Sequence, residues 1–576
     1  MNKHKDYISL IICGEAGQGI QTVELLLTRI FKASGFNVYA TKEYMSRVRG
    51  GSNSVEICIS SRKVRAPVNY IDIAVLLDKE ALGHVKNRLS ESTIVLGEKD
   101  VIGPSPRKIL DMPFLKEANE IGSKIYANII AVGVISGILG IEEKNAIECV
   151  RSKFLNKSKD IIEHNSKAVQ KGYNLAQNLV SSNTIPNDKF LISRGKATLK
   201  DEIICNGAEA IGIGALAGGC SFVSSYPMSP STGVLVFLSK EAAKFNVIAE
   251  QAEDEISAIN MAIGAWYAGG RALVTTSGGG FALMEEGVSL AAMLEVPIVV
   301  HVAQRPGPAT GLPTRTEQGD LELVLYSGHG EFPRVIFAPG SVEDAFFCAH
   351  RAFHIADKYQ IPAFILTDQY LMDSYYNCLP FTVPKEDSKN QIIKTDKNYK
   401  RYRITENGLS PRGIPGYGDG LVLVDSDEHD ENGRITEDMN VRTKMVEKRL
   451  RKFTLINKDI IPPKLIGNPN YSTLLISWGS TFHIVKEAID QLKRDDIALL
   501  HFNQVFPLHK DVATYLKKAK KTIIIENNAT SQFGKLIKLY TGIEINEKIL
   551  KYSGLSFFVD ELVERLSNVV RRELVS

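Results

Sequence analysis

The 576-residue chain carries 69 Lys and Arg residues against 66 Asp and Glu residues, so its formal net charge at pH 7 is only +3. This near balance excludes a surface that is cationic along the whole chain, and we expect no nucleic-acid partner. With 44% hydrophobic residues, the chain is also no disordered polyampholyte. At about 100–200 residues per domain, its length predicts two to four domains with ordinary cores.

Cysteine usage and apolar stretches bear on the location of the protein. The cysteines form no C-x-x-C pair, which predicts a reducing, cytoplasmic setting and no zinc or iron–sulfur cluster on this chain. The N-terminal residues run directly into a strand-like segment, so we expect no signal peptide. Two uncharged stretches are poor membrane spans, because 126–141 is too short and 210–239 is broken by a polar turn. No membrane association is expected.

In the first 180 residues, strand and helix patterns alternate. Short apolar or β-branched runs predict strands at 8–13, 54–59 and 71–77, and apolar residues at helical spacing predict a helix over 20–33 and further helices to about residue 180. Such alternation is typical of a mostly parallel sheet with helices on both faces. We therefore expect a first domain over 1–182, followed by a polar, proline-bearing linker over 183–200.

Two further α/β domains are expected, over 201–455 and 456–576. The strands of the second are predicted at 245–248, 272–276, 298–302, 335–337 and 363–367, with helices over 255–267 and 342–357. An irregular stretch over about 380–433 and a charged helix over 444–452 follow. The third has predicted strands at 474–478, 498–502 and 522–525, and a closing amphipathic helix over 555–574. The fold class is therefore α/β, with three doubly wound, mostly parallel domains.

Two glycine-containing segments of the first domain are candidate anion sites. The turn G-E-A-G-Q-G, which contains Gly17 and Gly19, joins a strand to a helix, where backbone amides can approach a phosphate. Its spacing is neither a dinucleotide fingerprint nor a P-loop, and a plain tight turn is an alternative. Arg47 and Arg49 lie beside Gly50 in R-V-R-G-G-S-N, which suits a phosphate-rich ligand or a solvated loop equally.

The turn Y-P-M-S-P-S-T, at residues 226–232, places two prolines and three hydroxyl groups directly before a helical run. Either Ser231 or Thr232 is suited to cap that helix. Hydroxyl groups on a rigid turn, including those of Ser229 and Thr232, also suit the binding of a carboxylate, so both interpretations stay open.

Glu255 begins a helix pattern in which Glu255, Ile259 and Ile263 fall on one face. That face is otherwise apolar, so one carboxylate is placed where it is partly desolvated and suited to hold or share a proton. Stabilisation of the first helical turn by acidic residues is the alternative, and it explains Glu253 and Asp254 better than Glu255.

Two further glycine-rich stretches follow predicted strands, at the edge where parallel sheets bind ligands. One is T-T-S-G-G-G-F at 275–281, and the other is Q-R-P-G-P-A-T-G-L-P-T at 304–314. Arg305, in the second, offers a forked guanidinium donor that suits the carboxylate of a ligand. Farther along, G-D-G at 418–420 lacks the asparagine that a magnesium–diphosphate motif needs at the right distance, and we interpret it as a turn.

Together, these motifs resemble the alpha subunit of 2-oxoacid:ferredoxin oxidoreductases, and most closely the 2-oxoglutarate type. The resemblance rests on Y-P-M-S-P-S-T, the Glu255 helix, T-T-S-G-G-G-F-A-L-M, Q-R-P-G-P-A-T-G-L-P-T-R-T-E-Q-G-D-L and D-E-H-D-E-N-G-R-I-T-E-D. The N-terminal G-E-A-G-Q-G and R-V-R-G-G-S-N-S resemble the gamma subunit of the same family, here fused ahead of alpha. Gly279 stands where the family pattern has a proline.

The resemblance implies a thiamine-diphosphate enzyme that oxidatively decarboxylates a 2-oxo acid to an acyl-CoA and passes electrons to ferredoxin. It implies a gamma-like domain, a pyrimidine-binding domain and a transketolase C-terminal-like domain in this chain. A separate beta subunit would supply Mg2+, the diphosphate-binding half of the site and a 4Fe-4S cluster, and no metal site is expected here. The partners would be that beta subunit, ferredoxin, coenzyme A and a 2-oxo acid, for which the closest resemblance implies 2-oxoglutarate.

The resemblance also implies roles for particular residues. Glu255 would hydrogen-bond the aminopyrimidine of the cofactor and act as the catalytic acid. Ser229, Thr232 and Arg305 would hold the substrate carboxylate. Candidates for coenzyme A contacts are Gly17, Gly19, Arg47 and Arg49.

Three alternatives remain at this stage. Pyruvate, indolepyruvate or a branched-chain 2-oxo acid could replace 2-oxoglutarate as the substrate. A nicotinamide- or flavin-dependent dehydrogenase would use the 14–19 turn for a dinucleotide, against its non-standard spacing. A non-catalytic scaffold subunit would keep the fold and need no buried acid.

Overall fold

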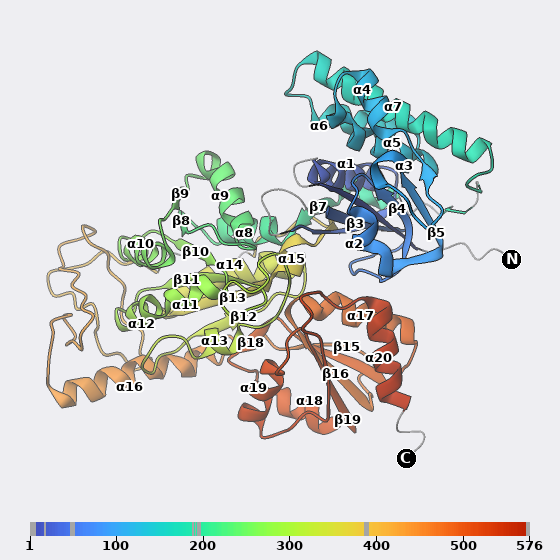
Figure 1. Cartoon of the computed structure of the whole chain (residues 1–576). Helices are drawn as coiled ribbons and strands as arrows, with labels where there is room; N and C mark the ends of the chain where they lie inside the picture. Colours follow the sequence, from blue (N-terminus) through green and yellow to red (C-terminus); the bar gives the residue numbers. More distant parts are fainter. Residues whose placement is uncertain are drawn as a thin grey trace. The chain divides into compact units, whose positions relative to one another are not determined.

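The computed structural model describes residues 7–15, 19–45, 52–186, 189–190, 192, 197–384 and 391–571. These residues form two compact units. The first unit contains the chain up to Cys205 together with 373–380 and 558–564, and the second contains the remainder. Three sheets with helices packed on them make up the two units, so the predicted α/β class is confirmed (Figure 1).

The sheet of the first unit has eight strands in the order β6-β5-β4-β1-β3-β2-β14-β7. Its strands are β1 (Tyr7–Glu15), β2 (Asn37–Glu43), β3 (Ser52–Ser60), β4 (Ile71–Leu76), β5 (Leu89–Gly97), β6 (Leu110–Asp111), β7 (Ile203–Asn206) and β14 (Tyr375–Cys378). The four strands β6, β5, β4 and β1 are parallel. The next three run antiparallel to their neighbours, because β3 pairs with β1, β2 with β3 and β14 with β2. The expectation of a mostly parallel sheet thus holds for half of this domain, and β2 and β5 were not predicted.

Helices cover this sheet. They are α1 (Ile20–Ala33), α2 (Ala81–Val85), α3 (Lys99–Ile102), α4 (Phe114–Ile121), α5 (Ala127–Ile138), α6 (Glu143–Lys153) and α7 (Lys159–Ser181), with short 3-10 turns at Lys86–Arg88, Lys124–Tyr126 and Ala197–Asp201. The uncharged stretch at 126–141 is α5, a core helix that is buried along its whole length. Glycine permits its close packing on α7, because a Cβ on Gly172 would lie 2.0 Å from the carbonyl oxygen of Ile130. No described helix is long and apolar enough to cross a membrane.

The larger sheet of the second unit has seven strands in the order β18-β12-β13-β11-β10-β8-β9. They are β8 (Phe222–Ser225), β9 (Ile248–Gln251), β10 (Ala272–Thr276), β11 (Ile298–Gln304), β12 (Val335–Phe337), β13 (Pro362–Asp368) and β18 (Gln504–Phe506). All pair in parallel except β18, which runs antiparallel to β12. The strand predicted at 245–248 was wrong: α9 continues to Phe245, left-handed Asn246 ends it, and β9 starts only at Ile248.

Helices on both faces complete this domain. They are α8 (Gly207–Ala217), α9 (Thr232–Phe245), α10 (Glu255–Tyr267), α11 (Gly278–Leu283), α12 (Glu285–Met293), α13 (Leu321–Leu325), α14 (Val342–Tyr359) and α15 (Gln369–Asp373). The stretch from 391 to 438 is irregular, as the loss of periodicity predicted, and leads into α16 (Met439–Ile456). Within it, the backbone bends at 419–420, and Gly418 bridges to Thr395.

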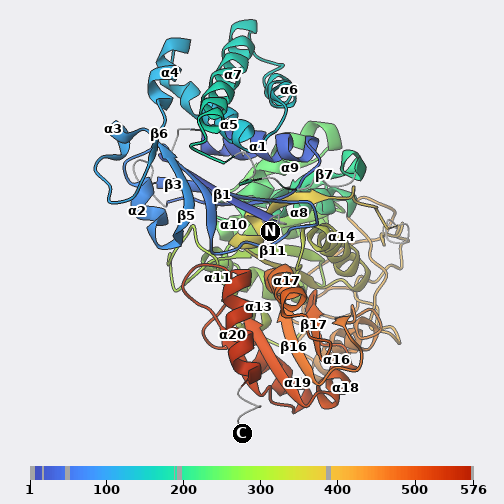
Figure 2. The same cartoon turned by 90° about the vertical axis from the view of Figure 1, so that its right-hand side faces the viewer.

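The smaller sheet of the second unit has the order β15-β17-β16-β19-β20 (orange to red in Figure 2). Its elements are β15 (Lys464–Gly467), β16 (Thr473–Trp478), a 3-10 turn at Gly479–Thr481, α17 (Phe482–Leu492), β17 (Ile497–Phe502), α18 (Val512–Lys518), β19 (Lys521–Glu526), α19 (Gln532–Thr541), β20 (Glu547–Leu550) and α20 (Val559–Arg571). Only β15 runs antiparallel to its neighbour. The predicted closing helix begins later than expected, at Val559, and β15 and β20 were not predicted.

Candidate active site

The candidate site residues of the second unit follow the carboxyl ends of neighbouring parallel strands. The turn that contains Ser229 follows β8, the glycine stretch follows β10, and Arg305 follows β11. Because β8 and β11 both pair in parallel with β10, these three loops emerge at one edge of the sheet. This is the edge at which open α/β sheets bind ligands.

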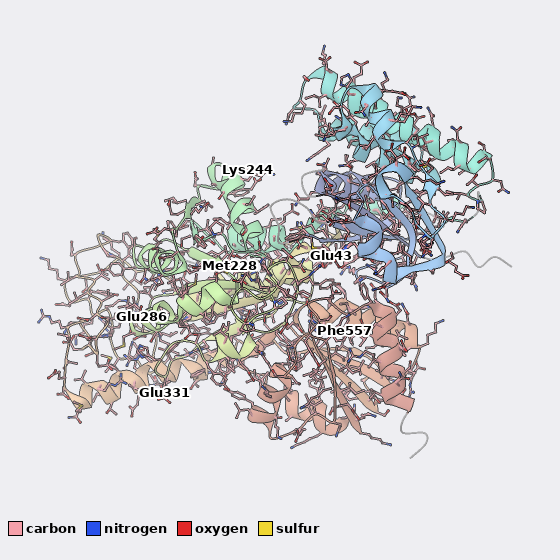
Figure 3. The ribbon with its side chains drawn as sticks, viewed as in Figure 1. Glu43, Met228, Lys244, Glu286, Glu331 and Phe557 are labelled. Atoms are coloured by element: carbon pink, nitrogen blue, oxygen red, sulfur yellow. The ribbon has the colours of Figure 1, made fainter. Side chains whose placement is uncertain are left out.

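Arg305 and the Ser229 turn are in contact. The half-buried Arg305 guanidinium donates a hydrogen bond from Nη1 to the backbone oxygen of Ser229 at 2.8 Å. Ser231 does not cap α9 as one interpretation predicted, since its hydroxyl donates instead to the carbonyl of Met228 at 2.7 Å. Met228 is labelled in Figure 3. The turn is therefore held by its own hydrogen bond and by Arg305, and Thr232 begins the helix.

Glu255 is the first residue of α10 and is only 4% exposed. Ile259 and Ile263 share its buried face, as the spacing predicted. Asp254 is the N-cap of the helix, because its side chain accepts a hydrogen bond from the amide of Ser257 at 2.7 Å. Helix capping therefore does not account for Glu255, and its Oε1 atom finds no hydrogen-bond partner among the described residues.

The glycine stretch at the start of α11 lies between two carboxyl groups. A Cβ on Gly280 would lie 2.5 Å from Oε1 of Glu255, and a Cβ on Gly278 would lie 2.4 Å from Oδ2 of Asp320. Glycine is thus required at both positions so that the backbone can approach each carboxyl group. Gly279 lies between them, and a Cβ there would meet only the carbonyl oxygen of Ala309, at 3.6 Å.

Three buried oxygen atoms around this stretch lack a partner in the described part of the chain. They are Oε1 of Glu255, Oγ of Ser277 and Oδ2 of Asp320. Buried polar atoms are almost always hydrogen-bonded, so such a group at the ligand-binding edge of a sheet is a mark of a ligand site. The sequence motifs contained Ser277 and Asp320, but no period or spacing distinguished them from their neighbours.

The loop from Arg305 to Asp320 is fixed at its far end by the smaller sheet. Gln318 donates from its amide nitrogen to the carbonyl of Trp478 at 2.8 Å and accepts from the backbone amide of Asn527 at 2.9 Å. Gln304, at the end of β11, accepts from the backbone amide of Asp320 at 2.9 Å. Contacts with both sheets of the second unit therefore hold the two ends of this loop in place.

In the first unit, only part of the proposed anion site is described. Gly17, Arg47 and Arg49 lie outside the described residues. Gly19 adopts a left-handed conformation (φ 82°) at the N-terminus of α1, a backbone state that favours glycine. A cavity of about 480 Å³ opens at the carboxyl ends of the parallel neighbours β1 and β4, with Glu15, Leu76 and Asn128 in its lining.

Several large apolar side chains near Glu255 are exposed. On the exposed face of α10, Ile256 is 51% and Met261 is 37% exposed, and on the adjacent α11 Leu283 is 54% exposed. Neighbouring loops and strands add Tyr226 and Ile248, which are exposed as well. No group of three or more His, Cys, Asp or Glu residues placed to hold a metal ion occurs in the described ranges.

Comparison with known proteins identifies related chains. Residues 213–448 match the family model described as pyruvate flavodoxin/ferredoxin oxidoreductase, thiamine diphosphate-binding, and residues 9–175 match the one described as pyruvate ferredoxin/flavodoxin oxidoreductase. A 2-oxoacid:ferredoxin oxidoreductase alpha subunit from a Sulfolobus species is 31% identical over 98% of this chain and 97% of its own. A 2-oxoglutarate synthase subunit from Archaeoglobus fulgidus is 30% identical over 64% of this chain and 99% of its own.

A solved structure is similar over nearly the whole chain. It is a 2-oxoglutarate:ferredoxin oxidoreductase from Magnetococcus marinus with 2-oxoglutarate, coenzyme A and succinyl-CoA bound. The TM-score is 0.88 at 28% identity, over 98% of this chain and 100% of the other.

Proposed function

The chain belongs to the 2-oxoacid:ferredoxin oxidoreductase family as an alpha subunit, and from this premise we propose that it oxidatively decarboxylates 2-oxoglutarate to an acyl-CoA in a complex with a beta subunit. Ferredoxin is the proposed electron acceptor. The observation that carries the proposal is the buried, unpartnered Oε1 of Glu255 within a domain of the thiamine-diphosphate-binding family. We favour 2-oxoglutarate over other 2-oxo acids because the Archaeoglobus relative and the Magnetococcus enzyme are named for it.

The described residues fit an aminopyrimidine ring. Such a ring carries an amino donor, and Glu255 and Ser277 present oxygen atoms that lack partners among the described residues around Gly278–Gly280. When bound, thiamine diphosphate supplies the electron sink that decarboxylation of a 2-oxo acid requires. Glu255 would hold the pyrimidine and share a proton with its ring nitrogen, a role for which a buried acid on a rigid helix is suited.

Arg305 is the proposed ligand of the substrate carboxylate, with Ser229 and Thr232 beside it. Its Nη1 is engaged with the Ser229 carbonyl, which fixes the plane of the guanidinium and leaves the other donors for a ligand. Hydrogen bonds from a positioned guanidinium to a carboxylate are among the stronger ones in proteins. Coenzyme A contacts are proposed for Gly17 and Gly19 of the 14–19 turn and for Arg47 and Arg49. The cavity at the ends of β1 and β4, which Glu15 lines, supports a ligand site in this unit.

The beta subunit is proposed to dock on the apolar surface around Glu255. Ile256, Met261 and Leu283 are the large exposed side chains there, and burial of such side chains drives most protein association. Mg2+ and a 4Fe-4S cluster are proposed to reside on that subunit, because the cysteines of this chain are scattered without a cluster spacing. All seven cysteines are free thiols, which supports a reducing, cytoplasmic location.

Replacement of Glu255 tests the proposal. In the reconstituted complex, E255Q keeps the size of the side chain and a hydrogen bond but cannot share a proton. We expect thiamine diphosphate to bind within about tenfold of the wild-type affinity, and turnover to fall by about 10²–10⁴-fold. The decisive readout is hydrogen–deuterium exchange at the reactive carbon of the bound cofactor, which should slow to a similar degree.

The matched control is E253Q, which removes an exposed acid of the same loop. It should leave both exchange and turnover unchanged. If the cofactor carbon exchanges at the wild-type rate in E255Q, Glu255 is not the acid that shares a proton with the pyrimidine. A wild-type complex that oxidises no 2-oxo acid would contradict the proposed function as a whole.

A further inference from the structure

Asp320 is a second buried carboxyl group beside the glycine stretch, separate from Glu255. It directly precedes α13, and its carboxyl group lies against the backbone of Gly278, with Oδ2 buried and unpartnered among the described residues. Its backbone amide is fixed by Gln304, the residue before Arg305. Burial and the nearby Glu317 raise the pKa of Asp320 to about 7, and the charge of Arg305 opposes that rise.

The charges that face Asp320 come from several elements. Glu317, on the same loop, has its own pKa raised by burial. Arg305 follows β11, and its electrostatic interaction with Asp320 is felt by both groups. Glu255 of α10 lies across the glycine stretch. On the far side, Glu322 of α13 forms an exposed ion pair with Lys535 of α19 at 3.0 Å.

We propose that Asp320 is a positioning residue that couples substrate binding to proton uptake: when the carboxylate of a 2-oxo acid occupies Arg305, the side chain of Asp320 takes up a proton from solvent. This inference rests on the proposed function and deepens it. An ionised Asp320 competes with the substrate for the single positive charge of Arg305. A protonated Asp320 leaves Arg305 free and is itself able to donate a hydrogen bond.

The physical basis is reciprocal linkage. A substrate carboxylate beside Asp320 disfavours the ionised form of Asp320, since two like charges then share one cation in a partly desolvated site. Ionisation of Asp320 weakens substrate binding by the same amount of free energy. Substrate affinity is therefore highest below the pKa of Asp320 in the free enzyme and declines as pH rises through it, until Asp320 is ionised in the complex too.

The test measures KM for 2-oxoglutarate against pH in the reconstituted complex. We expect KM of the wild type to rise about three- to tenfold between about pH 6 and about pH 8.5, since each unit of pKa coupling is worth about tenfold in affinity. In D320N, KM should stay near the low-pH value throughout, with kcat and thiamine diphosphate affinity changed less than about threefold. In E317Q, the rise should move to lower pH, because a negative charge that favours protonation of Asp320 is gone.

E322Q is the matched control, an exposed acid on the adjoining helix, and it should leave the pH profile unchanged. Infrared difference spectra of the full chain alone, wild type minus D320N, give a readout independent of activity: the C=O stretch of a protonated carboxyl group should disappear as pH rises through about 7. The inference is overturned if D320N keeps the rise in KM, if E317Q does not move it, if Asp320 is ionised at about pH 6, or if D320N instead loses the cofactor. A wild-type complex that turns over no 2-oxo acid contradicts the proposed function instead, whatever the infrared titration gives.

Discussion

At the scale of single residues, the space around the glycine stretch sets the position of Glu255. A Cβ on Gly280 would lie 2.3 Å from Oγ1 of Thr276 and 2.5 Å from Oε1 of Glu255, distances that the neighbours must relieve by moving. The glycine stretch therefore leaves room for the two carboxyl groups because it has no side chains. Single Gly→Ala substitutions test this.

We predict that Gly280→Ala lowers stability by about 1–3 kcal/mol, as overpacking of a buried site usually does, and displaces Glu255. The matched control is Gly279→Ala, whose new Cβ meets only the Ala309 carbonyl at 3.6 Å and gains helix propensity. Thermal unfolding midpoints and thiamine diphosphate affinity in the complex are the measurements. If both variants unfold alike and bind the cofactor equally, the close approach at Gly280 is not a constraint on the site.

Residues with a periodic or motif context were predictable from the sequence, and residues placed by tertiary contacts were not. Glu255 could be identified because Ile259 and Ile263 share its face at helical spacing, and the structure buries all three. The burial of Asp320 depends on Gly278, which lies far from it in the sequence. The proposed capping role of Ser231 failed for a similar reason, since its hydroxyl bonds to the preceding turn instead.

At the scale of elements, a buried ion cluster fixes α16 and the irregular stretch before it. Glu295, after α12, pairs with Lys448 and Lys452 of α16 at 2.6 Å each, and all three side chains are at most 1% exposed. Arg401, from the irregular stretch, donates to the carbonyl of Glu295 at 2.7 Å. The pKa of Glu295 is held well below its usual range because the lysines outweigh the cost of burial. One carboxylate thus holds two elements on the larger sheet of the second unit.

We predict that Glu295→Gln destabilises the domain by about 3–5 kcal/mol, because two buried lysines lose their counter-charge. The matched control is Lys535→Met, which breaks an exposed ion pair with Glu322 and should cost less than about 1 kcal/mol. Thermal unfolding and limited proteolysis of residues 391–456 are the measurements. Equal shifts in the two variants, or no new cleavage in E295Q, would contradict the assigned role of the cluster.

The sequence predicted more elements of the second unit than of the first. β10, β12 and α10 lie at the predicted residues because each is a clear apolar run bounded by turn residues. β14 could not be predicted, because it pairs with β2 from more than 300 positions earlier in the chain. Neither could the antiparallel half of the first sheet, since strand direction depends on which partner a strand finds rather than on its own residues.

At the scale of the whole molecule, the exposed side chains around Glu255 suggest that the site is completed by another chain. Ile256 and Met261 lie on the face of α10 opposite the buried Glu255, and they are 51% and 37% exposed. An apolar surface next to a buried, unpartnered carboxylate is more typical of an interface than of a free surface. The scattered cysteines favour the proposal that the iron–sulfur cluster resides on the partner.

We therefore predict that the 576-residue chain expressed by itself is colourless and oxidises no 2-oxo acid, and that addition of the proposed beta subunit gives both colour and turnover.

The double variant I256E/M261E should prevent assembly, because two charges would be buried in an apolar interface, while its thermal unfolding stays that of the wild-type chain. The matched control is L539E, which places one charge on α19 at a side chain that is 66% exposed and outside the proposed interface. It should assemble and turn over normally. Size-exclusion chromatography of the mixed chains and a viologen-coupled assay measure the two effects. A brown, active single chain would refute the split site, and normal assembly of I256E/M261E would place the partner on another face.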